Sequence, residues 1–305
     1  MEFAKYEGCG NDFILVREEE LPSALLEQDG QHPARRREDH GLPALARRLC
    51  HRLLGIGADG LILVKGDPLT MTIYNSDGSR APMCGNGIRC FAKYCLDSGI
   101  VPAGTQTMQV ATLAGTKTIR VLPPGKDGGF LVEVDMGCPD FSARSLGVEA
   151  DGDFDRQKID VGGVGLTVSG VNTGTIHVVV WLDEDRITAA KTPMDLFHDS
   201  KLDLFGRTLS SHGLFQERTN VNFARVLGSD EITMITWERG AGLTAACGTG
   251  ACAAAVIGMR EKGLHRTVRV YLPYGELSVT LDDAGRLLMC GGASKAFTGS
   301  TDITA

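Results

Sequence analysis

The chain has 305 residues, of which 43% are hydrophobic and 23% charged, and its formal net charge is −7. These values are ordinary for a globular protein above the size of one domain, so we expect two domains of about 150 residues. The acidic balance argues against a broad nucleic-acid or anionic-membrane surface. No apolar run approaches the roughly 18 residues that a membrane span requires.

In chain order, short β-rich segments bounded by Gly, Pro or Asp predict strands through both halves of the sequence. In the first half they are FILV (13–16), GLILV (60–64), LTMTIY (69–74), TKTIRVL (116–122) and FLVEVDM (130–136). In the second half they are IHVVVW (176–181), NFARVL (222–227), EITMITW (231–237), TVRVYLP (267–273) and ELSVTL (276–281). Strands therefore dominate the predicted fold.

Helices are expected at about 43–53, 86–98, 193–204 and 248–262. The last of these is apolar nearly all round, so it should be buried in the middle of its domain. The helix at 86–98 is mostly apolar but has Arg89 and Lys93 on one side.

Residues 18–42 are polar, with scattered Pro and Gly, and predict an insertion at the surface. Within it, ARRRED (34–39) is basic but is balanced by acidic residues before and after it. We interpret this run as a solvated surface rather than a binding site.

The chain has nine cysteines, and its opening MEFAKYEGCGNDFILV is too polar at its centre for a signal peptide. We therefore expect reduced thiols in the cytoplasm rather than a disulfide framework. No C-x-x-C pair occurs, so a zinc ribbon or a thioredoxin-type site lacks its usual spacing.

One pattern occurs twice in this sequence. Cys84 in MCGNGIRC and Cys247 in ACGTGACA are each followed by Gly-x-Gly and by a run that predicts a helix. Tyr74 stands ten residues before Cys84, and Trp237 stands ten residues before Cys247. These matching offsets predict a duplicated architecture with equivalent positions in the two domains.

Each of the two cysteines is expected at the turn into its helix. There the first amide groups and the helix dipole lower a thiol pKa and can hold an anion. If one cysteine is a thiolate and the other a thiol, one can remove a proton from a carbon while the other delivers a proton to the opposite face. A carboxylate at the helix N-termini would fix that carbon, and the amides would stabilise the charge that builds up. The pair therefore predicts inversion of a stereocentre.

The other cysteines are expected to be packing residues, because free cysteine is among the most buried residue types. They are Cys50, Cys90, Cys95, Cys138, Cys252 and Cys290. Cys9 lies between two glycines in a polar loop and is expected to be a bystander.

Seven landmarks in order over about 240 residues resemble the diaminopimelate epimerase family. They are GNDF (10–13), GIGADG (55–60), NSDGS (75–79), CGNG (84–87), ERTNVNF (217–223), ERGAG (238–242) and ACGTG (246–250). The resemblance implies two similar α+β domains, each a curved mixed sheet or barrel around a central helix, with the active site in the cleft between them. Residues 1–130 and the tail 292–305 would form one domain, and residues 131–291 the other.

Position by position, the resemblance implies that Cys84 and Cys247 are the catalytic acid and base. It also implies a set of residues that bind the substrate and one, His177, that tunes a thiol. The binding set is Asn11, Asn75, Gly85, Asn86, Thr175, Asn220, Glu238, Arg239, Gly248 and Thr249.

The sequence departs from the family pattern in three places. Thr175 in GTIH stands where the family usually has an asparagine that contacts the distal end of the substrate. A threonine has no amide donors, so that contact is lost or rebuilt, through water or Asn172. Leu243 occupies a position that is often acidic, and LPYG (272–275) replaces the common LPGG. A two-cysteine racemase of the same fold that acts on a different amino acid therefore stays open.

Three further interpretations fit parts of the sequence less well. GIGADG spells the dinucleotide motif but follows a predicted helix and precedes a strand, which reverses the required order. A redox pair of Cys84 and Cys247 would more readily mean inactivation than function. An amino-acid-binding protein on the same scaffold would not need two activated thiols.

The resemblance thus implies a pyridoxal-independent epimerase that interconverts LL- and meso-diaminopimelate, in lysine and peptidoglycan precursor biosynthesis. We expect no metal, no cofactor, a small amino-acid substrate as the partner, and neither nucleic acid nor membrane. A homodimer is what the resemblance implies.

Overall fold

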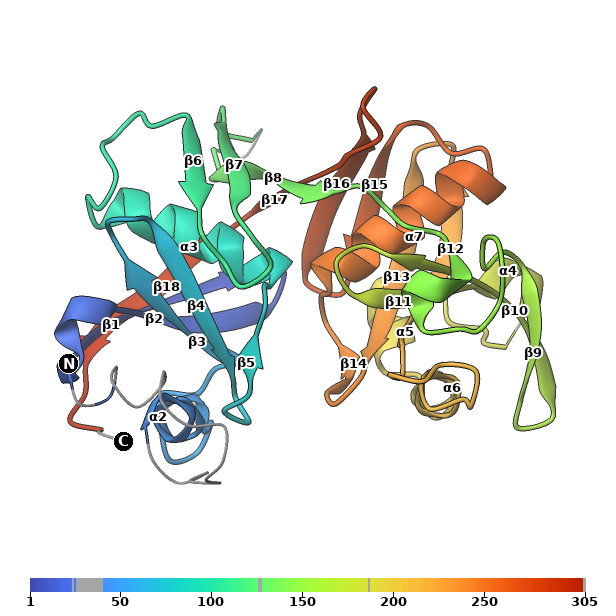
Figure 1. Ribbon diagram of the computed structural model, residues 1–305, viewed down its shortest axis with the longest axis horizontal. Coiled ribbons are helices and arrows are strands. Elements are labelled where there is room, and N and C mark those ends of the chain that lie inside the picture. Colours follow the sequence, from blue (N-terminus) through green and yellow to red (C-terminus); the bar gives the residue numbers. More distant parts are fainter. Residues whose placement is uncertain (24, 26–40, 126–127, 186, 304–305) are drawn as a thin grey trace. The chain divides into compact units, whose positions relative to one another are not determined.

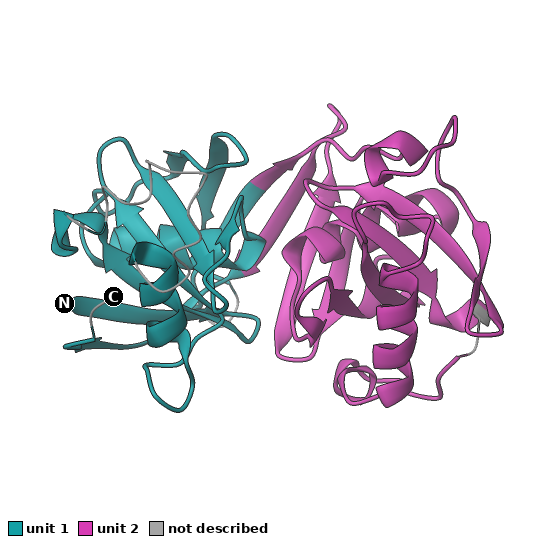
Figure 2. Ribbon diagram, turned by 60° about the horizontal axis from the view of Figure 1, so that its bottom comes forward, with its two compact units in different colours: residues 1–134, 292–305 teal, residues 135–291 magenta. Residues whose placement is uncertain are grey.

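The computed structural model describes residues 1–23, 25, 41–125, 128–185 and 187–303, in two compact units (Figure 1, Figure 2). Unit 1 comprises Met1–Val134 with Gly292–Ala305, and unit 2 comprises Asp135–Gly291. The chain passes from unit 1 to unit 2 inside strand β8 (Leu131–Gly137) and returns inside strand β17 (Leu287–Gly292). Sheets and helices occur together in each unit, which confirms the α+β class.

Unit 1 contains a six-stranded sheet in the order β18-β1-β2-β3-β4-β5, and the antiparallel run β6-β7-β8. The strands are β1 (Glu2–Gly8), β2 (Asn11–Arg17), β3 (Gly60–Lys65), β4 (Thr70–Asn75), β5 (Arg80–Ala81), β6 (Thr107–Val110), β7 (Lys117–Leu122) and β18 (Ser294–Ser300). The helices are η1 (Glu18–Glu20), α2 (Gly41–Cys50) and α3 (Gly85–Asp97).

Unit 2 contains strands in the order β17-β16-β15-β13-β12-β11-β10-β9, with β14 paired to β13. They are β9 (Gln157–Val161), β10 (Val164–Asn172), β11 (Ile176–Trp181), β12 (Asn220–Gly228), β13 (Glu231–Glu238), β14 (Gly242–Thr244), β15 (Thr267–Leu272) and β16 (Gly275–Leu281). The helices are η2 (Ala143–Leu146), α4 (Leu182–Asp185), α5 (Pro193–Phe197), α6 (Ser200–Ser210) and α7 (Gly248–Glu261).

The strand pairing of unit 1 is repeated in unit 2. β1–β2 is antiparallel, β2–β3 parallel and β3–β4 antiparallel, and β10–β11, β11–β12 and β12–β13 follow the same sequence of directions. The short pairs β4–β5 and β13–β14 are also equivalent. The parallel pairing of β13 with β15 corresponds to a single parallel bridge between Thr70 and Ala111 in unit 1. This repetition supports the duplication that the two cysteine motifs predict.

In each unit one helix packs against several strands (Figure 1). α3 contacts β1, β2, β3, β4 and β18, and α7 contacts β10, β11, β12, β13, β15 and β16. Ten of the fourteen residues of α7 are buried, which agrees with its apolar composition. Because both helices are central, the residue at the start of each is held by the surrounding strands.

Arg89 departs from the expectation for α3, because it is fully buried whereas Lys93 is half-buried. Its guanidinium group donates to Gly292 O at 3.0 Å, to Gly85 O at 3.1 Å and to Asn86 Oδ1 at 2.8 Å. Burying a charge without hydrogen-bond partners in an apolar core costs free energy, and these hydrogen bonds offset that cost for Arg89.

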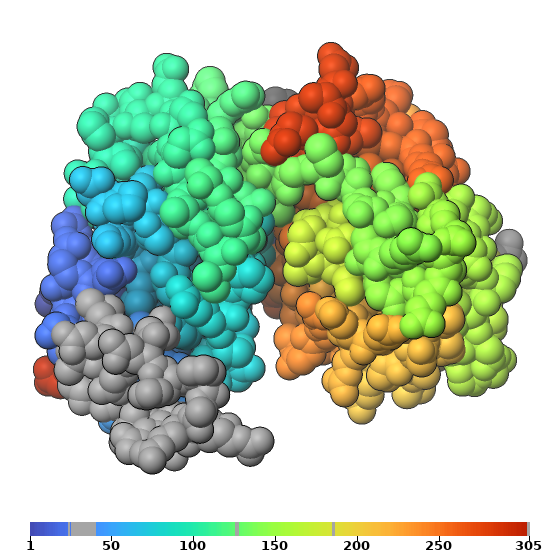
Figure 3. All heavy atoms as spheres, viewed as in Figure 1, coloured from blue at the N-terminus to red at the C-terminus, as the bar shows by residue number. Residues whose placement is uncertain are grey.

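The predicted helix at 193–204 is two helices, α5 and α6. Thr192 and Asp195 form a capping box at the start of α5, and the Asp199 carboxylate accepts from Lys201 N–H at 2.9 Å to start α6. Asp199, which is the N-cap of α6, therefore ends the predicted helix although the apolar residues continue at helical spacing on both sides of it. This segment lies on the surface of unit 2 (Figure 3), where the Leu204 side chain is 62% exposed.

The other predictions for local structure divide as follows. All ten predicted strands are present, with ends that differ by a few residues. The prediction of a packing role is wrong for Cys138, which is exposed. For Cys290, which is half-buried, it holds only in part. Most of the predicted insertion at 18–42, including the ARRRED run, lies outside the described residues. No described helix is long and apolar enough to span a membrane.

Candidate active site

Cys84 occupies the N-cap position of α3 in unit 1. Its backbone is extended, with φ −137° and ψ 123°, and its Sγ accepts a hydrogen bond from Gly87 N–H at 3.4 Å. The Cys84 Sγ–H also faces Asn11 Oδ1 at 3.8 Å. A sulfur at this place receives a backbone amide and lies at the positive end of the helix dipole, and both favour the thiolate.

Asn11, at the start of β2, is held by Asp59. The Asn11 amide Nδ2 donates to Asp59 Oδ2 at 2.6 Å, so its Oδ1 is left to face Cys84 and to accept from Asn86 Nδ2 at 3.2 Å. Asp59 Oδ1 in turn accepts from Arg52 Nη2 at 2.7 Å. Asp59 therefore fixes which atom of Asn11 points at the sulfur.

A cluster of charges lies beside this contact. Asp12 pairs with Lys5 at 2.8 Å and with Arg52 at 2.9 Å. Burial raises the pKa of Asp12, but the hydrogen bonds from Arg52 and Lys5 outweigh it, and the pKa lies below its usual value. The carboxylate of Asp12 is thus ionised and keeps the turn before β3 attached to β2 through Asp59 N–H at 3.0 Å.

The remaining predicted residues of unit 1 lie in two places. Gly85 and Asn86 form the first turn of α3, and Asn86 is oriented by Arg89, which donates to its Oδ1. Asn75 is the last residue of β4, is exposed, and donates from Nδ2 to Ser79 Oγ at 2.9 Å. The hydrogen bonds of unit 1 therefore bring Cys84, Asn11 and Asn86 together, and Asn75 stands apart from this group.

Cys247 occupies the N-cap position of α7 in unit 2, which is the equivalent of Cys84. Its backbone is extended, with φ −132° and ψ 109°, and its side chain makes no cap hydrogen bond. It is 6% exposed, and its Sγ lies 3.4 Å from Thr249 Oγ1. Its hydrogen-bond partner is therefore a hydroxyl group of the first helical turn, whereas Cys84 faces a side-chain amide oxygen.

His177 is fully buried in β11 and connects to Cys247 through Thr249. Its Nε2 lies 2.9 Å from Thr249 Oγ1 and 2.8 Å from Thr175 Oγ1, and its Nδ1 lies 3.2 Å from Asn222 Nδ2. Burial, together with the positive charge of Arg239, lowers the pKa of His177 to about 3. The imidazole is therefore neutral at physiological pH.

Thr175, at the position where the family usually has an asparagine, is hydrogen-bonded to other side chains of unit 2. Its hydroxyl group joins the His177 and Thr249 cluster and lies 3.2 Å from Thr249 Oγ1. Asn172, the other residue expected to rebuild that contact, donates from its Nδ2 to Ser145 O at 3.1 Å and accepts at its Oδ1 from Gly174 N–H at 2.9 Å. The Asn172 amide is thus hydrogen-bonded to the backbone of Ser145, in η2, and of Gly174.

Three predicted residues lie where β12 begins and β13 ends. Asn220 is buried, and its Oδ1 accepts from the Arg239 backbone N–H at 3.0 Å. The Arg239 guanidinium group donates to Glu217 O at 2.9 Å, and the Glu238 carboxylate accepts from Thr244 Oγ1 at 2.6 Å. Asn220 and Arg239 are joined, while Glu238 is held by the neighbouring strand β14.

Cys50 and Cys95 are buried away from the two N-caps. Burial raises the pKa of Cys50 and of Cys95 to about 12. Both are therefore neutral packing residues, as the sequence predicts.

The sequence reasoning did not find Asp59, Asn222 or Thr236, which hold the predicted residues in place. Asp59 lies in GIGADG, which is a landmark of the family resemblance but to whose residues the resemblance assigns no role. Asn222 follows Asn220 by two residues in TNVNF, and alternate residues of a strand share a face. A second asparagine on the inward face of a predicted strand was the signal available.

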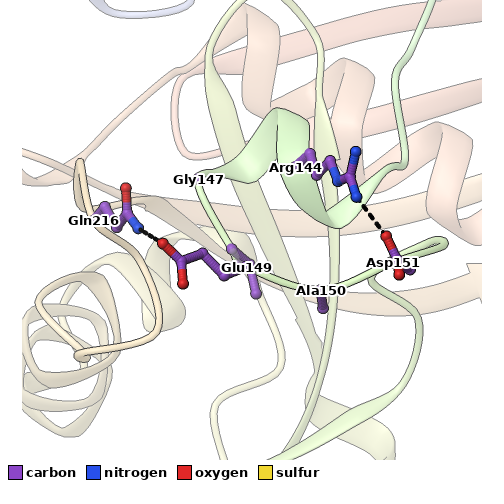
Figure 4. Close-up of a pocket in the computed structure, with 7 residues that line it drawn as sticks. Arg144, Gly147, Glu149, Ala150, Asp151 and Gln216 are labelled. Atoms are coloured by element: carbon purple, nitrogen blue, oxygen red, sulfur yellow. Dashed lines mark hydrogen bonds and ion pairs between the residues drawn. The ribbon is translucent and has the colours of Figure 1, made fainter.

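A surface pocket elsewhere in unit 2 contains none of these residues (Figure 4). It has a volume of about 460 Å³ and is lined by Arg144, Gly147, Val148, Glu149, Ala150, Asp151 and Gln216. Its polar groups are paired with each other, Arg144 with Asp151 at 2.6 Å and Gln216 with Glu149 at 3.1 Å. Among the described residues, no group of His, Cys, Asp and Glu side chains is arranged to hold a metal ion.

Comparison with known proteins decides the family. The family model described as diaminopimelate epimerase matches residues 3–142 and 170–296. The chain belongs to the diaminopimelate epimerase family. It is 38% identical over 309 residues to the diaminopimelate epimerase of Synechococcus sp. (strain JA-3-3Ab), covering 99% of this chain and 98% of that protein. It is 39% identical over 305 residues to that of Moorella thermoacetica, covering 98% of each.

Two solved structures with the same fold share less of the sequence than these epimerases do. A hydroxyproline epimerase from Agrobacterium vitis superposes with a TM-score of 0.67 at 13% identity, over 98% of this chain and 90% of that one. A Bacillus anthracis phenazine biosynthesis protein of the PhzF family superposes with a TM-score of 0.65 at 13% identity, over 99% of both chains. These likenesses establish the fold that the family shares with other proteins.

Proposed function

We propose that the protein interconverts LL- and meso-diaminopimelate, with Cys84 and Cys247 as the acid and base. The observation that carries this proposal is the equivalence of the two cysteines, each at the N-cap of the central helix of a duplicated unit. Membership of the diaminopimelate epimerase family supports the substrate. A binding protein would have no need for a thiol at both positions.

In the proposed reaction, the thiolate of one cysteine takes the α-proton of the substrate and becomes a thiol. The electron pair of the broken C–H bond moves onto the α-carbon and its carboxylate. The thiol of the other cysteine then gives its proton to the opposite face of that carbon and becomes a thiolate. The protein ends with the two protonation states exchanged, and no proton is gained or lost overall.

The carboxylate at the reacting carbon would lie at the helix N-termini. Gly85 and Asn86 would supply amide and polar groups from α3, and Gly248 and Thr249 would supply them from α7. These dipoles would stabilise the negative charge of the intermediate without reorganising.

The distal amino-acid head would be bound by Asn75, Asn220, Glu238 and Arg239, with Asn11 at the same site. A guanidinium group can hold a carboxylate with two parallel hydrogen bonds, and a carboxylate or amide oxygen accepts from an ammonium group. Asn220 would also position Arg239, since it already holds the Arg239 backbone.

The reaction needs neither pyridoxal phosphate nor a metal ion, because the two thiols supply the proton transfers and the helix N-termini stabilise the charge. It does need reduced thiols, which favours a reducing compartment such as the cytoplasm. The homodimer implied by the resemblance stays a prediction, to be tested by light scattering at several protein concentrations.

One observation favours a second candidate, a two-cysteine racemase for a different amino acid. The Thr175 hydroxyl group is hydrogen-bonded within the protein, to His177 and Thr249, at the position expected to contact the distal head. If that contact is not replaced, the distal head of diaminopimelate is bound less well than in the rest of the family.

The two candidates are separated by α-proton exchange in D₂O, followed by NMR on LL-diaminopimelate and on a panel of other L-amino acids. We expect exchange with diaminopimelate alone, and the Thr175→Asn variant should keep that activity. The exposed Cys138→Ser variant serves as the control for thiol substitution. Exchange with another amino acid, abolished by Cys84→Ser and by Cys247→Ser, would show that the chemistry is right and the substrate wrong.

A further inference from the structure

Asn222 has no direct place in the proposed reaction, and yet it is a fully buried polar residue in the centre of unit 2. It lies in β12, opposite Val179 of β11 and opposite Thr236 of β13. Its Oδ1 accepts from Thr236 Oγ1 at 2.9 Å, and its Nδ2 reaches His177 Nδ1. The strands beneath the start of α7 thus contribute a connected group of polar side chains.

The duplicated unit shows that the fold does not require polar residues there. In unit 1 the register pairs Leu15 with Ile62 and Ile62 with Ile73, so Ile62 is the equivalent of Asn222, and Ile73 of Thr236. By the same register Phe13, paired with Gly60, is the equivalent of His177, paired with Asn220.

The glycines of the two cysteine motifs confirm this correspondence. A Cβ at Gly87 would meet Cδ1 of Ile62 and of Ile73, both at 3.2 Å. A Cβ at Gly250 would meet Asn222 Oδ1 at 2.4 Å and Thr236 Oγ1 at 2.9 Å. Both helices therefore rest on the same two strand positions, which are apolar under Cys84 and polar under Cys247.

The hydrogen bonds of Asn222 determine where the proton of His177 lies. The Asn222 Nδ2 lies 2.9 Å from Val178 O, and because a carbonyl oxygen only accepts, this atom must be the amide nitrogen. Its second hydrogen is directed at His177 Nδ1, which must then be an acceptor. Since the imidazole is neutral, its single proton is on Nε2.

The Nε2 proton in turn sets the direction of the next hydrogen bond. His177 Nε2–H faces the hydroxyl oxygens of Thr175 and Thr249, and the Thr175 hydroxyl donates to Thr249 Oγ1. Thr249 Oγ1 thus accepts hydrogen bonds from His177 and Thr175. Its own hydroxyl hydrogen is then directed at Cys247 Sγ, 3.4 Å away. A hydroxyl group that accepts a hydrogen bond becomes a stronger donor.

We propose that Asn222 is a positioning residue that fixes the Nε2–H tautomer of His177 and thereby turns the Thr249 hydroxyl group toward Cys247 as a donor. A donor at the sulfur stabilises the thiolate, so this chain of hydrogen bonds lowers the pKa of the Cys247 thiol. The charged residue that acts on the chain is Arg239, whose positive charge opposes protonation of His177. The proposal rests on the proposed function only in making Cys247 a catalytic thiol.

The tautomer is tested directly by ¹⁵N-labelled protein and long-range ¹H–¹⁵N correlation of the histidine rings, with His177→Phe to assign the signals. We expect His177 to show a protonated Nε2 and an unprotonated Nδ1. A protonated Nδ1, or a charged ring at pH 7, would overturn the proposal. This measurement requires no substrate.

The effect on the thiol is tested by the pH dependence of Cys247 alkylation by iodoacetamide in the Cys84→Ser background, with the modified peptide quantified by mass spectrometry. Because the thiolate is the reactive form, the midpoint of the profile reports the pKa. Asn222→Leu should raise the midpoint by about one pH unit and lower the rate at pH 7 about ten-fold. Thr249→Val should do the same.

Thr236→Val is the matched control. It removes a buried hydrogen bond from the same Asn222 but leaves the amide nitrogen fixed by Val178 O, so the midpoint should not move. Unchanged profiles in folded Asn222→Leu protein, with a melting curve like that of Thr236→Val, would show that Asn222 is only structural. Alkylation follows the thiol regardless of the substrate, so this result is distinguishable from a failure of the proposed function.

Discussion

Asp59 is the residue on which the geometry at Cys84 depends. Asn11 presents its carbonyl oxygen to the sulfur because its amide nitrogen is bound by the Asp59 carboxylate. The same carboxylate also accepts from Arg52, whose side chain is 59% exposed and whose ion pair is therefore screened by solvent. The part-buried contact with Asn11 and the exposed contact with Arg52 can be removed separately.

We predict that Asp59→Ala lowers kcat/KM about ten-fold, which is about 1.4 kcal/mol of transition-state stabilisation, because Asn11 is released. Arg52→Ala should change kcat/KM by less than a factor of two, since Asp59 still holds Asn11. The rates are measured by inversion of diaminopimelate, with urea unfolding to confirm that both variants are folded. Equal effects of the two substitutions would contradict this account of Asp59.

His177 makes the stability of the protein depend on pH in a defined window. The unfolded residue has a pKa of about 6.5, whereas burial and Arg239 lower the folded value to about 3. Between these values the unfolded chain binds one more proton than the folded chain. The contribution of neutral, buried His177 to the free energy of unfolding is therefore fully present above about pH 6.5 and is lost as the pH falls toward 3.

The His177→Phe variant, which copies Phe13 of unit 1, should remove this dependence. We predict that the free energy of unfolding of the parent falls by up to about 1.4 kcal/mol per pH unit more than that of the variant between pH 6 and pH 4. Urea denaturation at several pH values measures both slopes. Parallel slopes would mean that His177 titrates in the folded protein as it does in the unfolded chain.

At the scale of single residues, the sequence predicts the thiols but not the groups behind them. Cys84 and Cys247 are marked by glycines and by matching offsets, which are local in sequence. Asp59 and Asn222 act on residues 48 and 45 positions away, Asn11 and His177. Such partners depend on strand register, which the sequence pattern does not specify.

The two central helices differ in how closely they approach their sheets, although the sequence motif is the same. Gly87 and Gly250 both occupy the first turn of a helix with negative φ, so an alanine is permitted by the backbone at either place. Alanine is otherwise favoured over glycine in a helix by about 0.5–1 kcal/mol. The neighbouring strand residues therefore decide the outcome.

We predict that Gly250→Ala destabilises the protein by about 1–3 kcal/mol, because the new Cβ would overlap Asn222 Oδ1 and Thr236 Oγ1 in a rigid hydrogen-bonded pair. Gly87→Ala should cost less than about 1 kcal/mol, since the ends of Ile62 and Ile73 can shift by a few tenths of an ångström. Urea unfolding of the two variants makes the comparison. A larger loss for Gly87→Ala would contradict the packing described for α7.

At the scale of elements, the sequence predicts the strands well because they are short, β-branched and bounded by turn residues. It misses β5, β6 and β14, which are only two to four residues long, and β1, β9, β10, β17 and β18, where polar residues or glycines interrupt the pattern. It joins α5 and α6, because the apolar period continues across Asp199, whose capping role depends on backbone geometry. The pattern thus fails where a polar residue or glycine lies inside a strand, and where a capping residue lies inside a run with helical periodicity.

For the whole molecule, the duplication explains why one chain contains two central helices that each have a cysteine at the N-cap. The same order of strand directions surrounds α3 and α7, and each cysteine stands at the same end of its helix. The polar residues beneath Cys247 and the apolar residues beneath Cys84 then make the two thiols chemically different. Such a difference suits a reaction in which one sulfur begins as a base and the other as an acid.

The central claim is that two thiols act on opposite faces of one carbon. It is tested most directly by following deuterium incorporation and inversion of LL- and meso-diaminopimelate in D₂O with the Cys84→Ala and Cys247→Ala variants, and with Cys138→Ala as the control. We predict that each of the first two variants loses inversion in both directions. Any residual exchange should be confined to one isomer, and to opposite isomers in the two variants. Inversion by a folded variant that lacks either Cys84 or Cys247 would contradict the two-thiol mechanism.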